Sequence, residues 1–345
     1  MERIKIGDTN IEASRIALGT WAMGGFMWQN EPDEKEAIRT VHEAFDQGIN
    51  MIDTAPDYGL AKSETFIGKA LQESDVKRED IVLACKPGID WTNQGDVYRD
   101  MRPERVEEEV DNTLKRLKTD YIDLYQVHWR DKEVPMAEMA GMMKQLYDKG
   151  KIRAIGVTNF TPREMDEFRE ESPLHVTQNQ FNMFQRGQRD CFAYGERHQM
   201  TGLAWAPMAH GMLTGKMDKS TTFAEEDIRH SHPMYSEEQF TRHMDALEDL
   251  KAFAMERNKS MPQLAIRWVL SQPGLGIALW GARKPEQLKD IEGTSNWILD
   301  ETELKEIDDI LKRHIDDLES NYLEHYAPPH RSELQSLKYV RMEFS

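Results

Sequence analysis

Four side chains that could exchange protons stand at or just after the ends of short apolar runs. Asp53 lies in the second run and Tyr58 follows it by five residues, whereas Lys86 ends the third run and His128 the fourth. Taken singly, the aspartate could cap a helix, the histidine could be a satisfied core residue and the tyrosine could be packing. A buried lysine is harder to explain, because lysine is rarely buried without a partner. Together, these residues on consecutive runs indicate a site for proton transfer.

The apolar runs alternate with helical patterns, which predicts parallel strands joined by helices. Eight such units over about 300 residues favour an α/β fold of the closed (β/α)8 barrel type, in which the carboxyl ends of the strands carry the chemistry. An open doubly wound sheet is the competitor, but residues 18–25 lack its glycine-rich phosphate loop. The expected strands are residues 15–21, 49–55, 81–88, 121–129, 152–159, 176–181, 202–208 and 276–282, and the expected helices include 33–48, 62–73, 102–119, 135–150 and 161–172.

Three segments fall outside the repeat, and no linker divides the chain, so residues 1–345 are expected to form one domain. Residues 4–13 alternate around a Gly-Asp pair and predict an N-terminal hairpin. Residues 209–236 form a long polar loop after the seventh strand. Residues 314–345 form a C-terminal tail that we expect to dock on the barrel and shape the substrate pocket. Its apolar and aromatic residues are Tyr322, Leu323, Tyr326, Leu337, Tyr339, Val340 and Phe344.

Composition excludes several classes of partner. The net charge is 44 − 62 = −18 without a large basic cluster, which argues against nucleic acid and anionic membrane surfaces. No apolar run approaches the ~18 residues of a membrane span. Cys85 and Cys191 are too few for a disulfide framework, so a cytoplasmic protein is expected. A small molecule is the expected partner, and the oligomeric state stays open. No metal is expected, because His198, His210, His230 and His243 lack ligand spacing and are interpreted as solvated.

The motifs around the four side chains resemble the aldo-keto reductases. The resemblance rests on Asn-Met-Ile-Asp-Thr-Ala-Pro-Asp-Tyr-Gly at 50–59, Ala-Cys-Lys at 84–86, Gln-Val-His-Trp at 126–129 and residues 151–160. It covers roughly residues 10–315, and residues 280–288 look closest to the bacterial branch that includes stress-induced reductases.

The resemblance implies reduction of aldehydes or ketones to alcohols by hydride transfer from NADPH, which is preferred over NADH. Tyr58 would be the general acid, and a nearby Lys86 ammonium would lower the phenol pKa from about 10. Asp53 would hold Lys86, and His128 would orient the carbonyl oxygen.

The family's cofactor contacts carry over to residues that surround this site. Thr158, Asn159 and Gln178 would hold the carboxamide, Trp205 would stack on the nicotinamide, and Arg283 would read the 2′-phosphate. The expected cofactor contacts are Gly19, Thr20, Trp21, Asp53, Thr158, Asn159, Gln178, Trp205, Ala206, Pro207, Met208, Ala209, Gly211, Leu213, Lys216, Gly281, Ala282, Arg283 and Gln287. The expected substrate contacts are Trp21, Trp28, Tyr58, Trp91, His128 and Trp129.

Two other functions stay open at this point. A cofactor-binding regulatory subunit with slow catalysis is the first, because residues 183–186 are similar to such family members. A barrel hydrolase with two carboxylates is the second, although no glutamate ends a predicted strand. Rapid steady-state turnover would separate a reductase from a regulatory subunit.

Overall fold

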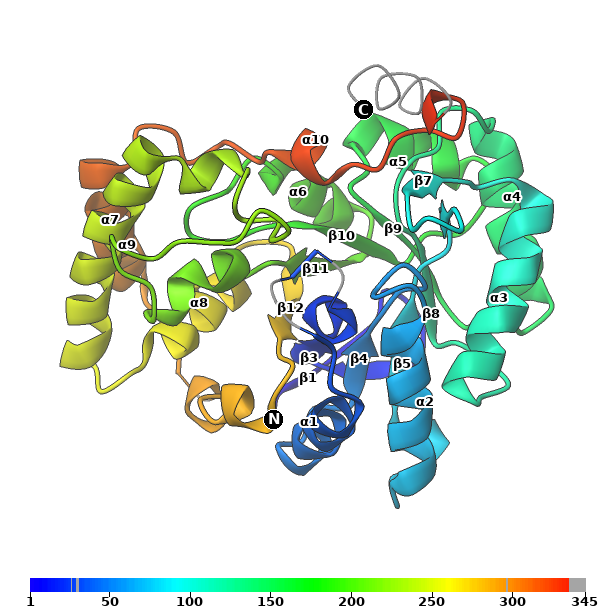
Figure 1. The fold of residues 1–345 in the computed structure, drawn as a ribbon, viewed down its shortest axis with the longest axis horizontal. Coiled ribbons are helices and arrows are strands. Elements are labelled where there is room, and N and C mark those ends of the chain that lie inside the picture. The colour runs from blue at the N-terminus through cyan, green and yellow to red at the C-terminus, as the bar shows by residue number, and fades with distance from the viewer. Residues whose placement is uncertain (26, 29–30, 296, 335–345) are drawn as a thin grey trace.

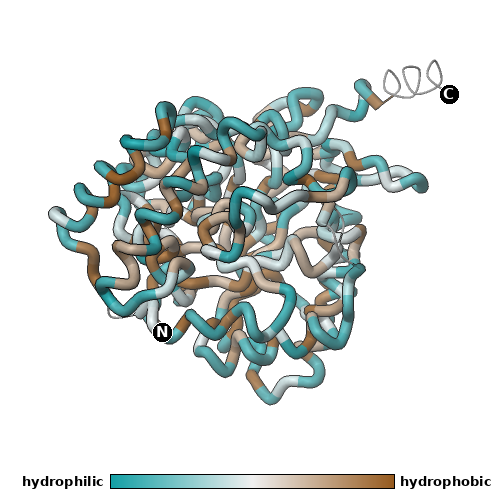
Figure 2. Tube along the Cα trace, turned by 60° about the vertical axis from the view of Figure 1, so that its left-hand side comes forward, coloured by the Kyte–Doolittle hydropathy of each residue, from teal (hydrophilic) through white to brown (hydrophobic). Residues whose placement is uncertain are grey.

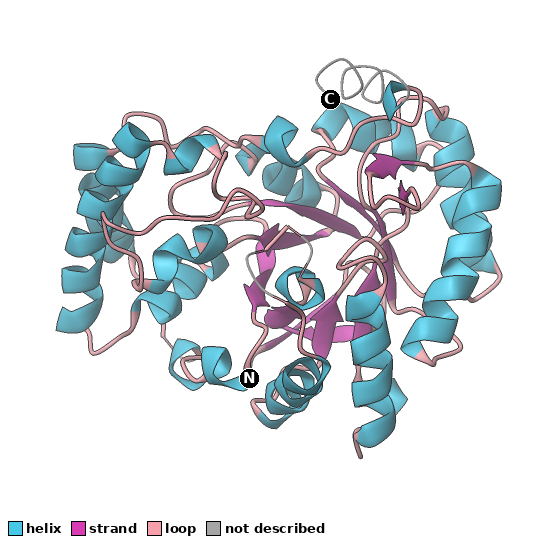
Figure 3. Ribbon diagram, in the orientation of Figure 1, coloured by secondary structure: helices cyan, strands magenta, loops and turns pink. Residues whose placement is uncertain are grey.

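A closed barrel of eight parallel strands forms the centre of the computed structural model, which describes residues 1–25, 27–28, 31–295 and 297–334. Figure 3 shows the strands enclosed by helices, and the predicted (β/α)8 class is confirmed. Around the barrel the order is β3 (Ile16–Gly19), β4 (Met51–Asp53), β5 (Val82–Cys85), β8 (Leu124–Val127), β9 (Ile155–Thr158), β10 (Val176–Gln180), β11 (Thr201–Trp205) and β12 (Leu275–Gly281), which pairs with β3 again.

The surrounding helices begin where the sequence supplies capping groups. The Thr161 hydroxyl accepts from the Glu164 backbone N–H, and the Glu164 carboxylate accepts in return from the Thr161 N–H. The helices are α1 (Glu34–Asp46), α2 (Lys62–Glu73), α3 (Pro103–Leu117), α4 (Met136–Asp148), α5 (Pro162–Arg169), α6 (Arg189–Arg197), α7 (Glu237–Glu256), α8 (Met261–Leu270), α9 (Glu301–His314) and α10 (Leu323–Tyr326). Short 3-10 helices span Trp21–Gly24, Arg78–Asp80, Ala209–Thr214, Pro233–Tyr235, Pro285–Leu288 and Glu292–Thr294.

The strands are shorter than the apolar runs that predict them. The run at 202–208 stops being a strand at Trp205, because Ala206 adopts a left-handed backbone with φ of 50°. The apolar residues beyond that point are buried in the loop over the barrel. An apolar run therefore marks burial more reliably than it marks the end of a strand.

Two hairpins flank the barrel at opposite ends. The predicted N-terminal hairpin is present as β1 (Arg3–Lys5) and β2 (Glu12–Ser14), and Ile6 and Ile11 pack against the barrel interior. The second hairpin, β6 (Ile89–Trp91) and β7 (Val97–Arg99), was not predicted. Its only local signal is the turn at Gly95, whose φ is 85°.

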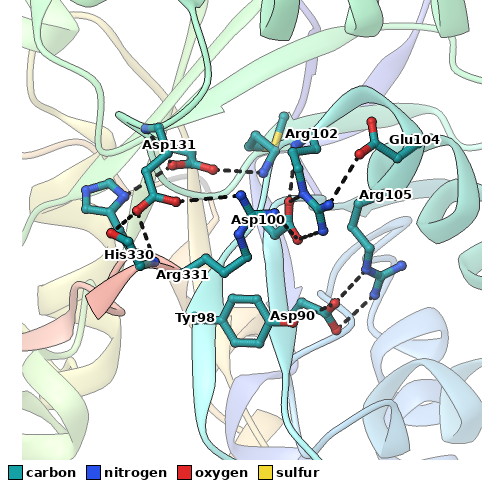
Figure 4. A network of polar contacts seen from close by, with 12 residues as sticks. Asp90, Tyr98, Asp100, Arg102, Glu104, Arg105, Asp131, His330 and Arg331 are labelled. Atoms are coloured by element: carbon teal, nitrogen blue, oxygen red, sulfur yellow. Dashed lines mark hydrogen bonds and ion pairs between the residues drawn. The ribbon is translucent and has the colours of Figure 1, made fainter. Parts of the chain in front are cut away.

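The C-terminal tail crosses the open end of the barrel. In Figure 1 it runs from α9 through α10 toward β7 and α4, and in Figure 2 hydrophobic segments concentrate inside while the outer turns are more hydrophilic. The Arg99 N–H donates to the Pro329 carbonyl at 2.9 Å. His330 Nδ1 lies 3.1 Å from Asp131 Oδ1, within the polar network of Figure 4. The tail residues Leu337, Tyr339, Val340 and Phe344 lie outside the described residues.

Candidate active site

A cavity of about 470 Å³ lies at the carboxyl ends of the strands, beneath the tail. Its walls come from the ends of barrel strands, from the loop after β11 and from residues 325–329 of the tail. Parallel strands bring their carboxyl ends to the same face of a barrel. Side chains far apart in the sequence therefore meet around one space.

A buried lysine joins two of the predicted residues. Lys86 Nζ lies 2.5 Å from Asp53 Oδ1 and 3.2 Å from Tyr58 Oη, and it also donates to the Thr54 carbonyl at 3.2 Å. The Lys86 side chain is 0% exposed. All three ammonium protons thus have acceptors, so the charge is held in one place.

The second oxygen of Asp53 accepts two amide protons. Gln126 Nε2 lies 3.2 Å and Gln178 Nε2 lies 2.9 Å from Oδ2. Gln126 was not predicted as a site residue, although it stands two positions before His128 in the same apolar run and so shares a strand face with it. A polar residue on that face of an apolar run was the available signal.

Close backbone packing places Tyr58. Gly59 has a φ of 69°, and a Cβ at either Gly59 or Gly24 would overlap the backbone of the other. Ser63 at the start of α2 donates to Thr20 Oγ1 at 2.9 Å. The turn after β4 is thereby held against the loop after β3, which presents the tyrosine to the cavity.

Burial changes the expected ionisation of the tyrosine. Burial raises the pKa of Tyr58 above its ordinary value, and Lys86 opposes that rise without reversing it. Burial alone would lower the pKa of Lys86, but Asp53 and Tyr58 raise it above the ordinary value. The sequence led us to expect a lowered phenol pKa. In this structure the direction is the opposite, because the effect of burial is larger than that of the Lys86 charge.

His128 completes the group of four at the cavity wall. Its ring lies 5.8 Å from the Tyr58 ring, centroid to centroid, in an edge-on arrangement. Its Nδ1 lies 3.2 Å from Oδ1 of Asp57, a residue that was not predicted. The four predicted catalytic residues thus lie together, with Asp57 beside them.

Three residues expected to hold the nicotinamide end have hydrogen-bond partners within the protein. The Thr158 hydroxyl donates to the Val127 carbonyl at 2.7 Å. Asn159 has a left-handed backbone with φ of 61°, and its Oδ1 accepts from Trp205 Nε1 at 3.0 Å. These bonds orient the amide and the indole before any ligand binds.

Most of the expected contacts line the cavity, but four do not. Ala209 and Leu213 are fully buried, and neither they nor Lys216 and Trp91 reach the cavity wall. The predicted residues at the wall are Gly19, Thr20, Trp21, Trp28, Asp53, Tyr58, His128, Trp129, Thr158, Asn159, Gln178, Trp205, Ala206, Pro207, Met208, Gly211, Gly281, Ala282, Arg283 and Gln287.

The cavity wall includes a half-buried arginine, Arg283. Burial lowers the pKa of Arg283, and the charge of nearby Arg229 lowers it further. The carboxylate of Asp227 holds Arg229 by two bonds of 2.7 and 2.8 Å. Gln287 Oε1 accepts from the backbone N–H of Arg283 at 2.8 Å, so this glutamine orders the turn.

The loop after β11 and the tail meet in a buried cluster that sequence reasoning missed. Met234 N–H donates to His232 Nδ1, so neutral His232 carries its proton on Nε2 and donates it to Tyr326 Oη at 2.5 Å. The Tyr326 hydroxyl then donates to His210 Nε2 at 2.8 Å. Burial, followed by neighbouring positive charges, lowers the pKa of His210 to about 3. His210 was expected to be solvated, as was His243, but both are buried because residues distant in sequence pack over them.

Among the described residues, no helix is both long and apolar enough to cross a membrane. No group of three or more His, Cys, Asp or Glu residues there lies in an arrangement that could hold a metal ion.

A closed parallel barrel with a buried lysine–aspartate pair beside a tyrosine at its mouth defines a class of (β/α)8 enzymes with a proton-transfer site. The model of the Aldo/keto reductase family matches residues 15–312, and the chain belongs to this family of oxidoreductases. The expected family resemblance is confirmed.

Individual relatives extend over nearly the whole chain. The chain is 47% identical over 336 residues to Aldo-keto reductase YhdN of Bacillus subtilis, covering 97% of this chain and 100% of the relative. It is 32% identical to the NADH-specific methylglyoxal reductase of Escherichia coli, covering 91% and 100%. The solved structure of the glycerol dehydrogenase AKR11B4 from Gluconobacter oxydans has 42% identity and a TM-score of 0.85, covering 91% of this chain and 96% of that one.

Proposed function

We propose that this protein is an NADP(H)-dependent reductase of aldehydes or ketones, with Tyr58 as the general acid. The observation that carries the proposal is the fully buried Lys86 ammonium, which contacts both Asp53 and the Tyr58 hydroxyl at the cavity. This arrangement holds one proton donor and one fixed positive charge where a carbonyl oxygen would acquire negative charge.

The lining of the cavity offers groups that suit a nicotinamide cofactor. Tyr58, the Asn159 amide, the Trp205 indole and the Arg283 guanidinium all belong to residues of its wall. Gly281 lines it, and among the described residues, apart from its chain neighbours, no atom lies within 4 Å of the position that a Cβ would occupy there. When bound, a reduced nicotinamide supplies the hydride that adds to the carbonyl carbon.

The protein's own residues complete the reduction. Tyr58 donates its hydroxyl proton to the carbonyl oxygen, which yields the alcohol and leaves a phenolate. The Lys86 ammonium at 3.2 Å stabilises that phenolate, and Asp53 keeps the ammonium in place. His128 lies at the same wall, where its ring can hydrogen-bond the substrate oxygen.

The proposed preference for NADP(H) rests on two neighbouring arginines of the cavity wall, Arg283 and Arg229. A 2′-phosphate requires a cation or several donors, and Arg283 is positioned at the wall with Arg229 close enough to lower its pKa. An anion between them would relieve that repulsion. The Escherichia coli relative is NADH-specific, so cofactor choice is to be measured on this chain.

We also propose that the tail closes the substrate pocket. Residues 325–329 line the cavity, and Tyr326 is bonded to both His210 and His232. Trp21 and Trp28, in edge-on contact at 5.3 Å, form the facing aromatic wall. The cytoplasm is the proposed location, in keeping with two free buried cysteines.

The test is oxidation of NADPH and of NADH by the purified protein against a panel of aldehydes, ketones and sugars. Steady-state turnover of at least one carbonyl compound, with loss of turnover in Tyr58→Phe, is the expected result. If the protein binds cofactor but turns over none of the compounds, the proposal is contradicted and the regulatory alternative is favoured.

A further inference from the structure

Two loops that follow the neighbours of β12 in the barrel meet at the cavity wall. Strands β3 and β11 both pair with β12, and Met27 and Ile228 lie in the loops after them. The Ile228 N–H donates to the Met27 carbonyl at 3.0 Å. Both residues line the cavity, as do Trp28 and Arg229, which follow them in the sequence. The hydrogen bond therefore brings the side chains of Trp28 and Arg229 to the same place.

Arg229 adds a second contact between the two loops. Its guanidinium carbon lies 5.3 Å from the centroid of the Trp28 ring. Asp227, whose side chain is wholly buried, accepts from Arg229 Nε at 2.8 Å and from Nη2 at 2.7 Å. Two bonds to one carboxylate fix the plane of a guanidinium. The cation is thereby held over the indole, where the ring attracts it.

The Trp28 indole has no hydrogen bond that could orient it instead. Its Nε1 is buried and has no hydrogen-bond partner among the described residues. The ring stands edge-on to Trp21 at 5.3 Å and lies 6.1 Å from the His210 ring. Of the cations that the structure describes, only Arg229 lies over it. Aromatic pairs and cation–π contacts contribute comparable energies, so the cation supplies a large share of what holds this ring.

We propose that Arg229 is a positioning residue for substrate, which holds Trp28 against Trp21 as one wall of the substrate pocket. The inference rests on the carbonyl reduction proposed above. The Trp21 ring lies 6.3 Å from the Tyr58 ring, centroid to centroid, so Trp28 stands one ring further from the proton donor. A large aromatic carbonyl compound reaches Trp28, whereas a small one ends beside Trp21. Arg229 thereby favours large aromatic substrates without touching the reacting atoms.

This role is separate from the attraction of Arg229 for a 2′-phosphate. An effect on the phosphate changes the affinity for NADPH. An effect through Trp28 changes the KM of a large carbonyl compound even when the cofactor is saturating. The two roles of one side chain are therefore measured by different constants.

The first test reads the geometry of the two indoles without substrate or cofactor. Two indoles at 5.3 Å and 81° couple their excited states, which gives a pair of bands of opposite sign in the far-ultraviolet circular dichroism spectrum. The bands are assigned to this pair by their loss in Trp28→Leu. Arg229→Met keeps the length of the side chain without its charge and should diminish the bands, whereas Arg229→Lys keeps a cation and should retain them. Bands of wild-type size in Arg229→Met would overturn the proposal.

The second test compares a large and a small aldehyde, naphthaldehyde and propanal, at saturating NADPH. Arg229→Met should raise the KM for naphthaldehyde about twofold to thirtyfold, the range of a cation–π contact, while kcat and the KM for propanal stay nearly unchanged. In a Trp28→Leu background the same change should have no further effect on KM. Lys259→Met is the matched control, since Lys259 lies over Trp297 at 5.1 Å, outside the cavity wall. A rise in KM that persists without Trp28 would contradict the inference.

The two tests separate this inference from the proposed function. A wild-type protein that reduces no carbonyl compound overturns the reductase activity, while the dichroism still reads the indole pair. An active wild type whose bands and KM are unchanged by Arg229→Met overturns the role of Arg229 alone. Thermal unfolding shows whether each variant is folded. If Arg229→Met does not fold, Asp227→Asn decides the question, because it releases the guanidinium and should change the bands and the KM in the same direction.

Discussion

Two buried aspartates lie at opposite ends of the barrel, and their carboxylates have different cationic partners. Asp123, just before β8, accepts from Arg78 at 2.7 Å and from Arg153 at 2.8 Å, and both arginines reach solvent. Asp53, at the end of β4, has one cation, Lys86, which is wholly buried. Both aspartates are almost completely excluded from water.

The difference lies in what each cation does beyond its carboxylate. Arg78 also donates to the backbone carbonyls of Ile81 and Tyr121, and both arginines lie over the Tyr121 ring. Lys86 also donates to a backbone carbonyl, but its remaining acceptor is the hydroxyl of Tyr58, a residue of the cavity wall. A buried ion pair becomes a candidate for chemistry when its cation has a further partner that a substrate can reach.

The largest expected effect comes from that further partner. Tyr58→Phe removes the proton donor, and general acid groups contribute about 10²–10⁴-fold to rate, so kcat should fall by that factor. Fluorescence titration should show little change in NADPH affinity. Tyr98→Phe, on β7 outside the cavity, is the matched control. If Tyr58→Phe reduced carbonyl compounds at a near-normal rate, the Asp53–Lys86 pair would have no catalytic role that the Asp123 ion pairs lack.

The two aspartates can be exchanged for asparagine one at a time. Removing one partner of a buried ion pair costs about 3 kcal/mol, so Asp123→Asn should lower the thermal midpoint but leave kcat unchanged. Asp53→Asn should lower both, because Lys86 loses the charge that holds it beside Tyr58. Calorimetry and steady-state kinetics on both variants provide the comparison. An equal loss of kcat in the two would show that both ends merely stabilise the fold.

The Arg283 side chain tests whether a cation at the cavity wall binds the 2′-phosphate of NADPH. Charge-assisted hydrogen bonds contribute roughly 1.5–3 kcal/mol, so Arg283→Ala should weaken NADPH binding about tenfold to a hundredfold and leave NADH nearly unchanged. Arg39→Ala is the control, because Arg39 lies near Glu286 of the same turn but outside the cavity wall. Equal losses for both cofactors would show that Arg283 does not read the 2′-phosphate.

The tail should affect substrates more than cofactor. Ending the chain after Ala327 removes Pro328 and Pro329 from the cavity wall together with the His330–Asp131 contact. The relative kcat/KM values over a carbonyl panel should change while NADPH affinity is kept. Ending the chain after Leu334 keeps these contacts and is the control. An unaltered substrate profile in the shorter folded chain would contradict the role of the tail.

The smallest expected effect is a dependence of tail docking on acid. The pKa values of His210 and His232 are lowered from 6.5 to about 3, so the docked state binds fewer protons than the free one. Docking is therefore unaffected above pH 6.5 and weakens as the pH falls toward 3. Hydrogen exchange of residues 322–334, taken relative to the intrinsic exchange rate at each pH, should increase as the pH falls from 7.5 to 5. His232→Gln removes one titrating group and should reduce this increase; the same increase in both proteins would exclude His232.

Much of the architecture follows from local patterns. Helix α2 (Lys62–Glu73) and the cap at Thr161 lie where the sequence predicts them, because helix periodicity and capping depend on residues a few positions apart. The β6–β7 hairpin was missed, because its short strands have no strong alternation and gain stability from the tail and α3.

The sequence by itself determined the barrel, the family and which ionisable residues end consecutive strands. Only the tertiary structure decided that Asp57 faces His128, that Gln126 supports Asp53, and that Tyr326 joins His210 to His232. It also decided that the pKa of Tyr58 lies above its ordinary value, because the effect of burial outweighs that of the Lys86 charge. A strand end can be read from a few neighbouring residues, but burial and the pairing of charges depend on segments that only folding brings together.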